Sequence, residues 1–233
     1  MNLTAQSASA AKKAPFLSIL VLQGQKPALP AGLELPKGFL EGFEGKPRQT
    51  RETFTSSTAW PRVQLVGLGE AAKVDHEGLR RAAAVAVKGM KAAQAKEAGL
   101  WVPAEVAACA DGEAHSGRDV AEGLVLGHYE YQGAKKVSKD AIELKKVTVW
   151  AESKDFAAGI KKGAALAEAC NFTRELQNRA GNQLTPTALA NEAKKLATRS
   201  PQITCKVFDE AAMKKMGMGL CSRSAKAATN PRS

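Results

Sequence analysis

The stretch Ala169-Cys-Asn-Phe-Thr-Arg-Glu-Leu-Gln-Asn-Arg-Ala-Gly-Asn-Gln-Leu-Thr-Pro-Thr-Ala-Leu-Ala190 decides how this chain of 233 residues is organised. A helix with small and apolar residues on one side is expected from Phe156 to about Gln177. Polar turn residues follow it, and Thr185 and Pro186 then provide the cap and the first position of another helix. The stretch therefore predicts a helical junction, residues 153–184, between two parts of the chain.

Before this junction, strands alternate with helices longer than ten residues. The apolar runs Phe16–Leu22 and Val63–Leu68 are typical of strands covered on both faces. Further strands are expected at 51–57, 99–103 and 145–151, and helices at 75–97, behind the cap Asp75, and at 117–131. This alternation predicts an α/β domain over residues 15–152 with a mixed sheet and flanking helices. Residues 1–14 are rich in Ala and Ser, and we expect them to be disordered.

After the junction, residues 185–220 read as the start of a second α/β domain. The alternating segment Pro201–Phe208 predicts a strand, and Asp209 caps a short expected helix that ends near Gly217. Residues 221–233 have neither a period nor a clear propensity. We interpret them as an aberrant tail and expect a frameshifted or prematurely ended gene.

The composition limits the classes of function. Lys and Arg number 34 against 23 Asp and Glu, a net charge of +11, which favours nucleic-acid binding only where the cations are clustered. Here the basic pairs Lys12-Lys13, Lys135-Lys136 and Lys145-Lys146 are dispersed and lack interleaved aromatic residues, so we interpret them as a solvated surface. The four cysteines show no paired spacing, which indicates reduced thiols in the cytoplasm. No apolar run approaches a membrane span of about 18 residues, so no membrane association is expected.

A glycine pattern after the second buried strand resembles a phosphate-binding turn. Gly67, Gly69 and Ala72 satisfy G-x-G-x-x-A between a strand and a helix. However, Pro103 stands where the ribose-binding acid would end the next strand, and Asp75 would repel phosphate at the helix start. We therefore favour a tight strand-to-helix turn.

Other polar residues do not combine into a reactive set. Asp75, His76 and Glu77 are adjacent on a helix and point about 100° apart, and Arg80 stands where a zinc helix would have its second His. His115 and His128 are thirteen positions apart with no nearby Cys or acid triad, so we interpret them as solvated or packed histidines, and Ser116 and Ser138 lack a nucleophile elbow. The residues alone thus predict no catalytic, cofactor-binding or metal site.

The junction carries a resemblance. Arg174-Glu-Leu-Gln-Asn178, together with Gly181-Asn182 and Thr185-Pro186-Thr-Ala-Leu-Ala190, resembles the leucyl (cytosol) aminopeptidase family. The similarity continues to about residue 220 and extends more weakly over residues 15–150, with Glu175, Gln177 and Ala180 departing from the family pattern. It implies a macro-like N-terminal domain, a linker helix and an incomplete α/β catalytic domain, with Asn178, Asn182, Thr185 and Pro186 as turn and cap residues.

In this family, the metal ligands and catalytic groups lie in two motifs, and neither motif occurs in this sequence. The resemblance implies a cytoplasmic homo-hexamer that uses two divalent metals, Mn or Zn, to hydrolyse N-terminal residues from peptides. Its motifs Lys-Gly-x-x-x-Asp-x-Gly-Gly and Asn-Thr-Asp-Ala-Glu-Gly-Arg are absent, since Lys162-Gly163 is followed by Ala-Ala-Leu-Ala. No catalytic, cofactor-binding or metal residue is carried over, and the chain is predicted to be inactive alone.

Three alternatives remain open at this point. A non-enzymatic DNA-binding module would suit the net charge of +11. A nucleotide or ADP-ribose binder would use the turn Gly67–Glu70. An unstable gene product is the third, because the helix 185–198 and the strand 203–208 lack a domain against which to bury their apolar faces.

Overall fold

The computed structural model describes residues 1–133 and 143–219. The predictions for Lys135-Lys136, Ser138 and the tail 221–233 fall outside the described residues. Two compact units make up the chain, residues 1–172 and the residues from 173 onward. Among the described residues, no helix is both long enough and apolar enough to cross a membrane.

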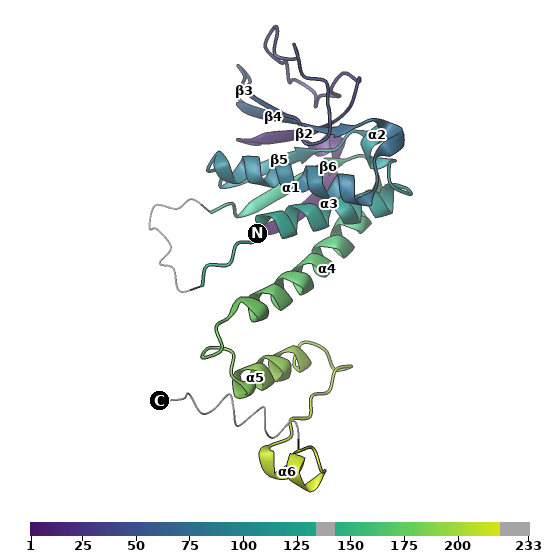
Figure 1. Cartoon of the computed structure of the whole chain (residues 1–233). Coiled ribbons are helices and arrows are strands. Elements are labelled where there is room, and N and C mark those ends of the chain that lie inside the picture. The colour runs from purple at the N-terminus through teal and green to yellow at the C-terminus, as the bar shows by residue number, and fades with distance from the viewer. Residues whose placement is uncertain (134–142, 220–233) are drawn as a thin grey trace. The chain divides into compact units, whose positions relative to one another are not determined.

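The first unit is built on one six-stranded mixed sheet (Figure 1). The strand order is β1-β6-β5-β2-β4-β3, in which β3 is antiparallel to β4 and all other neighbours are parallel. The strands are β1 (Asn2–Ser7), β2 (Leu17–Leu22), β3 (Thr50–Phe54), β4 (Arg62–Gly69), β5 (Glu97–Trp101) and β6 (Lys146–Ala151). This is the α/β class with a mixed sheet and flanking helices that the sequence predicts.

The central strands form where the sequence is continuously apolar. All six residues of β2 are buried between β4 and β5, with Ile19 beside Leu65 in the register. A strand covered on both faces needs apolar side chains in both directions, which explains the absence of alternation in β2. The predicted strands at Phe16–Leu22 and Val63–Leu68 are confirmed.

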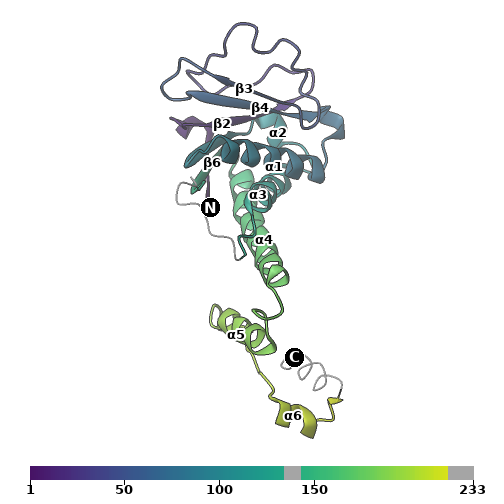
Figure 2. The same cartoon turned by 60° about the vertical axis from the view of Figure 1, so that its left-hand side comes forward.

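Helices cover one face of the sheet in this unit (Figure 2). They are α1 (His76–Ala92), α2 (Ala104–Ala107), α3 (Glu113–His128) and α4 (Lys154–Asn178), with 3-10 turns at Ala8–Ala10 and Ala71–Lys73. Asp75 caps α1, since its Oδ1 accepts from the backbone N–H of Gly78 at 2.7 Å. The opposite face has a separate apolar cluster, in which the Trp60 and Trp150 rings meet edge to face at 5.5 Å.

Helices α1 and α3 pack closely because glycine lies between them. A Cβ atom on Gly123 would lie 2.2 Å from the carbonyl oxygen of Arg80. A residue with a side chain at this position would force the two helix backbones apart. The close approach also brings the polar side chains of both helices within hydrogen-bonding distance.

The prediction of a disordered N-terminus over residues 1–14 is wrong. Residues 2–7 form β1, which pairs in parallel with β6 from Asn2 beside Lys146 to Ser7 beside Ala151. Leu3 and Ala5 pack against the helix-side core, whereas the rest of the strand is polar or exposed. An edge strand of this kind lacks the apolar run that identifies a buried strand, and its partner is about 140 residues away in sequence.

The second unit contains two short helices among its described residues, α5 (Pro186–Ala197) and α6 (Glu210–Lys215), besides the end of α4. The predicted strand at Pro201–Phe208 is wrong, because this segment has no regular structure. A strand requires a hydrogen-bonding neighbour, and none of the described residues pairs with it. No described residue from 173 onward is buried, and Ile203 and Phe208 are 53% and 41% exposed.

Candidate functional site

The glycines at the end of β4 lie against the backbone of the segment that connects β2 to β3. A Cβ atom on Gly67 would lie 2.2 Å from the carbonyl oxygen of Lys46, and Gly69 has a φ of +91°. The Gly69 N–H donates to the Gly45 carbonyl at 2.9 Å, and the Arg48 N–H donates to the Gly67 carbonyl at the same distance. These glycines therefore admit the segment between β2 and β3, in agreement with the predicted structural turn. The backbone of Gly45 and Lys46 occupies the space on the side where Gly67 would carry a Cβ atom.

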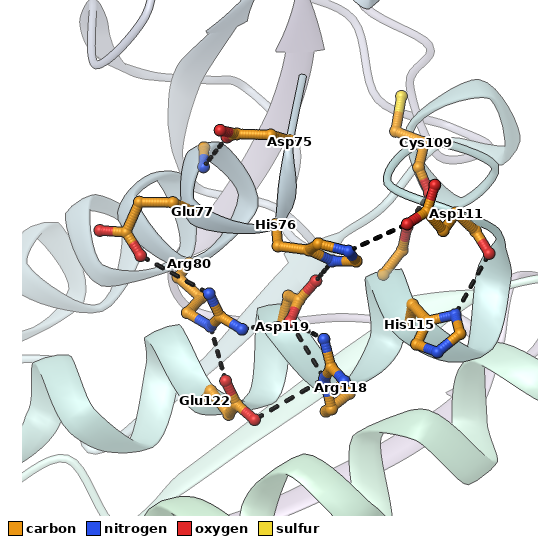
Figure 3. A network of polar contacts seen from close by, with 12 residues as sticks. Asp75, His76, Glu77, Arg80, Cys109, Asp111, His115, Arg118, Asp119 and Glu122 are labelled. Carbon is orange, nitrogen blue, oxygen red and sulfur yellow. Dashed lines mark hydrogen bonds and ion pairs between the residues drawn. The ribbon is translucent and has the colours of Figure 1, made fainter. Parts of the chain in front are cut away.

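The most concentrated set of polar side chains lies between α1 and α3, and we call it the Asp119 cluster: His76, Arg80, Asp111, Arg118, Asp119 and Glu122 (Figure 3). Asp119 has no solvent exposure. Its carboxylate lies 2.5 Å from His76 Nδ1 and accepts from Arg80 Nη2 at 3.0 Å and from Arg118 Nη2 at 2.9 Å. Three donor side chains from α1 and α3 thus surround this buried carboxylate.

Two further carboxylates, Glu122 and Asp111, contact Arg80 and His76 at the outer side of the cluster. Arg80 Nε donates to Glu122 at 2.6 Å, and His76 Nε2 lies 3.2 Å from Asp111. The hydrogen bond to Asp119 is the main reason that the pKa of His76 is raised, and Asp111 adds to it. The cluster thus connects α1 to α3 by ion pairs and places the His76 imidazole between the carboxylates of Asp111 and Asp119.

The three adjacent polar residues at the start of α1 point to different partners, as the helix geometry predicts. Asp75 caps the helix, His76 faces Asp119, and Glu77 accepts from Arg81 Nε at 2.8 Å. They cannot share one ion. Among the described residues, no three His, Cys, Asp or Glu side chains are grouped as metal ligands. The residues that the structure describes therefore do not fit the two-metal centre that the family resemblance implies.

The remaining candidates from the sequence, Ser116, His115 and His128, do not contact one another as a reactive group would require. Ser116 Oγ donates to the carbonyl of Cys109, and His115 Nδ1 lies 3.2 Å from the carbonyl oxygen of Asp111. Burial lowers the pKa of His128. No described residue provides a hydrogen-bond partner for His128 Nδ1. None of these side chains forms a nucleophile and base pair.

Lys162-Gly163 belongs to the body of α4. A Cβ atom on Gly163 would lie 2.2 Å from the carbonyl oxygen of Arg118, so this glycine permits the contact between α4 and α3. Lys162 is exposed. Gly163 of this dipeptide thus serves the packing of α4 on α3.

The junction residues have the turn and cap geometry expected from sequence. Thr185 Oγ1 accepts from the Ala188 N–H at 3.2 Å, and Pro186 is the first residue of α5. Asn178 is the last residue of α4, and Asn182 lies in the turn between the two helices. Arg179 and Glu192 connect the two sides of this turn at 3.3 Å.

The Asp119 cluster is the feature that sequence reasoning missed. His76 and Asp119 are 43 positions apart, and only the packing of α1 on α3 brings them together. The available signal is the spacing of Arg118, Asp119 and Glu122, which places charged residues on the side of α3 where Gly123 approaches α1.

The fold and the junction together define a mixed α/β domain that leads through a long helix into a second unit. The sequence model of the "Cytosol aminopeptidase family, N-terminal domain" matches residues 40–138, and that of the "Cytosol aminopeptidase family, catalytic domain" matches residues 171–233. The chain belongs to the cytosol aminopeptidase family, of which it comprises the N-terminal region.

Relatives with known names agree with this assignment. The probable cytosol aminopeptidase of Aquifex aeolicus (strain VF5) is 35% identical over 195 residues, which cover 83% of this chain and 38% of the relative. That of Solibacter usitatus (strain Ellin6076) is 35% identical over 158 residues, covering 68% and 32%. The chain therefore spans about a third of the length of these relatives.

Solved structures agree on the fold. The bottromycin maturation enzyme BotP in complex with Mn has a TM-score of 0.69 at 26% identity, over 88% of this chain and 40% of BotP. A mutant of tomato leucine aminopeptidase has a TM-score of 0.73 at 20% identity, over 93% and 46% of the two chains. The alternative of a DNA-binding or nucleotide-binding module is not favoured by these matches.

Proposed function

We propose that this chain is the N-terminal region of a metal-dependent aminopeptidase that hydrolyses N-terminal residues, Leu among them, from peptides. The observation that carries the proposal is the order of the two family matches. The N-terminal match lies within the first unit, and the catalytic match begins at residue 171, next to the boundary between the units.

The metals and the assembly belong to the same proposal. We place two divalent ions, Mn or Zn, in the part of the catalytic domain that is represented in the relatives and not in this chain. The Mn named for BotP supports a metal requirement. A homo-hexamer in the cytoplasm, with peptides as substrates, completes the proposal. No catalytic residue or metal ligand is assigned to residues of this chain.

The proposal predicts that the chain alone is inactive. Two-metal hydrolysis requires ligands that hold both ions and a polarised water, and the described residues do not group them. The test is release of p-nitroaniline from leucine p-nitroanilide by the purified chain with Mn²⁺ or Zn²⁺. The Aquifex aeolicus relative serves as the positive control, and a chelator-treated sample as the blank. We expect no release above the blank, and metal-dependent release by this chain would contradict the assignment of its catalytic groups elsewhere.

A further inference from the structure

A pocket of about 250 Å³ lies at the β1 end of the sheet. We call it the β1–β6 pocket, and the residues of its lining that matter here are Gln6, Lys12, Lys13, Glu97, Lys146 and Thr148. It is separate from the Asp119 cluster. Nothing in the proposed peptidase function uses it.

The strand register explains why this part of the sheet is polar. Asn2 is paired with Lys146, Thr4 with Thr148, and Gln6 with Trp150. Because side chains alternate along a strand, these residues share one face of the sheet. Val147 and Val149 point to the helix-side core instead. The pocket therefore lies on the face opposite the helices, where β1 and β6 present polar side chains.

Hydrogen bonds inside the pocket occupy the neutral acceptors. Trp150 Nε1 donates to Gln6 Oε1 at 3.2 Å, and Thr4 Oγ1 donates to Thr148 Oγ1 at 3.4 Å. These contacts leave the amide N–H groups of Gln6 and the hydroxyl hydrogen of Thr148 without an acceptor in the described part of the chain. A ligand rich in acceptors would satisfy them.

The charged side chains of the pocket also favour a ligand with acceptor groups, because most of them are cationic. Lys12, Lys13 and Lys146 line the pocket with Glu97 as the one acid. Across residues 1–133 and 143–219, no ion pair is formed by any of these lysines. Three ammonium groups and one carboxylate give a net charge of about +2, which matches a dianion.

The backbone holds the lysine pair at this place. The Ala11 N–H donates to the carbonyl of Ala8 at 3.1 Å, and the Ala14 N–H donates to the carbonyl of Ala59 at 3.0 Å. Ala8 and Ala14 are both buried, so Lys12 and Lys13 lie between two fixed points. The exposed side chains of both lysines can change rotamer, whereas the flanking hydrogen bonds fix the positions of their Cα atoms.

We propose that the β1–β6 pocket binds a small phosphate-bearing dianion, either inorganic phosphate or a phosphate monoester. The volume is below the range of about 300–1,000 Å³ of sites for drug-sized ligands, so the ligand is small. A tetrahedral phosphate offers acceptor oxygens in several directions, which suits three lysines on the rim and two neutral donors on the sheet.

The test is a calorimetric titration of the full chain at low ionic strength with inorganic phosphate, with O-phosphoserine and with succinate. We expect saturable binding of one phosphate group per chain, weakened by added NaCl because the cations are partly exposed. The monoester binding more tightly than inorganic phosphate would identify an ester as the natural source, and the reverse would identify the free ion. Succinate binding as tightly as both would overturn the phosphate assignment.

Matched variants locate the site. Lys146→Gln removes one pocket cation, and Lys88→Gln removes an exposed lysine of α1 that forms no ion pair with described residues. We expect K146Q to raise the dissociation constant about threefold to tenfold, and K88Q to leave it within about 1.5-fold. Thr148→Val tests the hydroxyl donor with little change of shape. Absence of saturable binding by the unaltered chain, or equal weakening by K146Q and K88Q, would overturn the proposal. Tryptophan fluorescence on heating confirms that each variant is folded.

Discussion

Replacing Asp119 by Asn tests whether the Asp119 cluster stabilises the first unit. The substitution keeps the size of the side chain and removes its negative charge. Asp119 has no solvent exposure and accepts from His76, Arg80 and Arg118. The neutral amide leaves these three donors without their buried carboxylate.

The expected loss of unfolding free energy depends on two facts: Asp119 is buried, and its arginine partners are partly exposed. Removing one partner of a buried ion pair costs about 3–5 kcal/mol of unfolding free energy. The Arg80 and Arg118 side chains are 30% and 24% exposed, and both retain Glu122 as a partner. We therefore expect a loss near the lower end, about 3 kcal/mol.

Urea unfolding monitored by tryptophan fluorescence measures this loss. All three tryptophans of the chain, Trp60, Trp101 and Trp150, lie in the first unit, so the signal reports that unit alone. Glu70→Gln is the matched control, because Glu70 pairs with Lys73 and both side chains are more than half exposed. The control is expected to lose less than about 1 kcal/mol.

The reasoning would be refuted if Asp119→Asn cost less than about 1 kcal/mol, or no more than Glu70→Gln. Either result would mean that solvent and Glu122 replace the contacts of Asp119. The ion pairs would then contribute little to the packing of α1 on α3.

Three further predictions concern other parts of the molecule. Because the pKa of His76 is raised in the folded state, the stability that His76 contributes is complete below its ordinary pKa and is lost as pH rises through the folded pKa. His76→Asn should therefore flatten the change of unfolding free energy between about pH 6 and pH 8. An unchanged pH dependence in urea unfolding experiments would contradict this. Gly123→Ala should destabilise the first unit by about 2 kcal/mol in the same unfolding assay, because the new Cβ would lie 2.2 Å from the Arg80 carbonyl oxygen, and full stability would contradict the close helix contact. Limited thermolysin digestion, followed by mass spectrometry, should cleave first between residues 173 and 219, where no residue is buried, and equal protection of both units would contradict this.

Sequence predicts the parts of the fold that have strong local signals. The apolar run of β2 and the stripe of α1 that includes Leu79 and Met90 identify buried elements without knowledge of their partners. Thr185 followed by Pro186 fixes the start of α5 for the same local reason. The cap and the period are physical requirements of the element itself.

Sequence fails where the decisive contact is distant. Strand β1 has only Leu3 and Ala5 directed to the core, and its hydrogen bonds go to residues 146–151. The segment 201–208 alternates like a strand, yet the described chain offers it no neighbouring strand. The Asp119 cluster likewise depends on the contact between two helices.

A chimera tests the central claim that this chain is the N-terminal region of a cytosol aminopeptidase and lacks the catalytic groups. Residues 1–219 are joined to the remaining catalytic domain of the Aquifex aeolicus relative at the aligned position. Leucine p-nitroanilide hydrolysis is measured for the chimera and for the unaltered chain, each with Mn²⁺ and after chelation. We expect metal-dependent turnover by the chimera and none by the unaltered chain. A folded chimera without activity, or metal-dependent turnover by the unaltered chain, would contradict the claim.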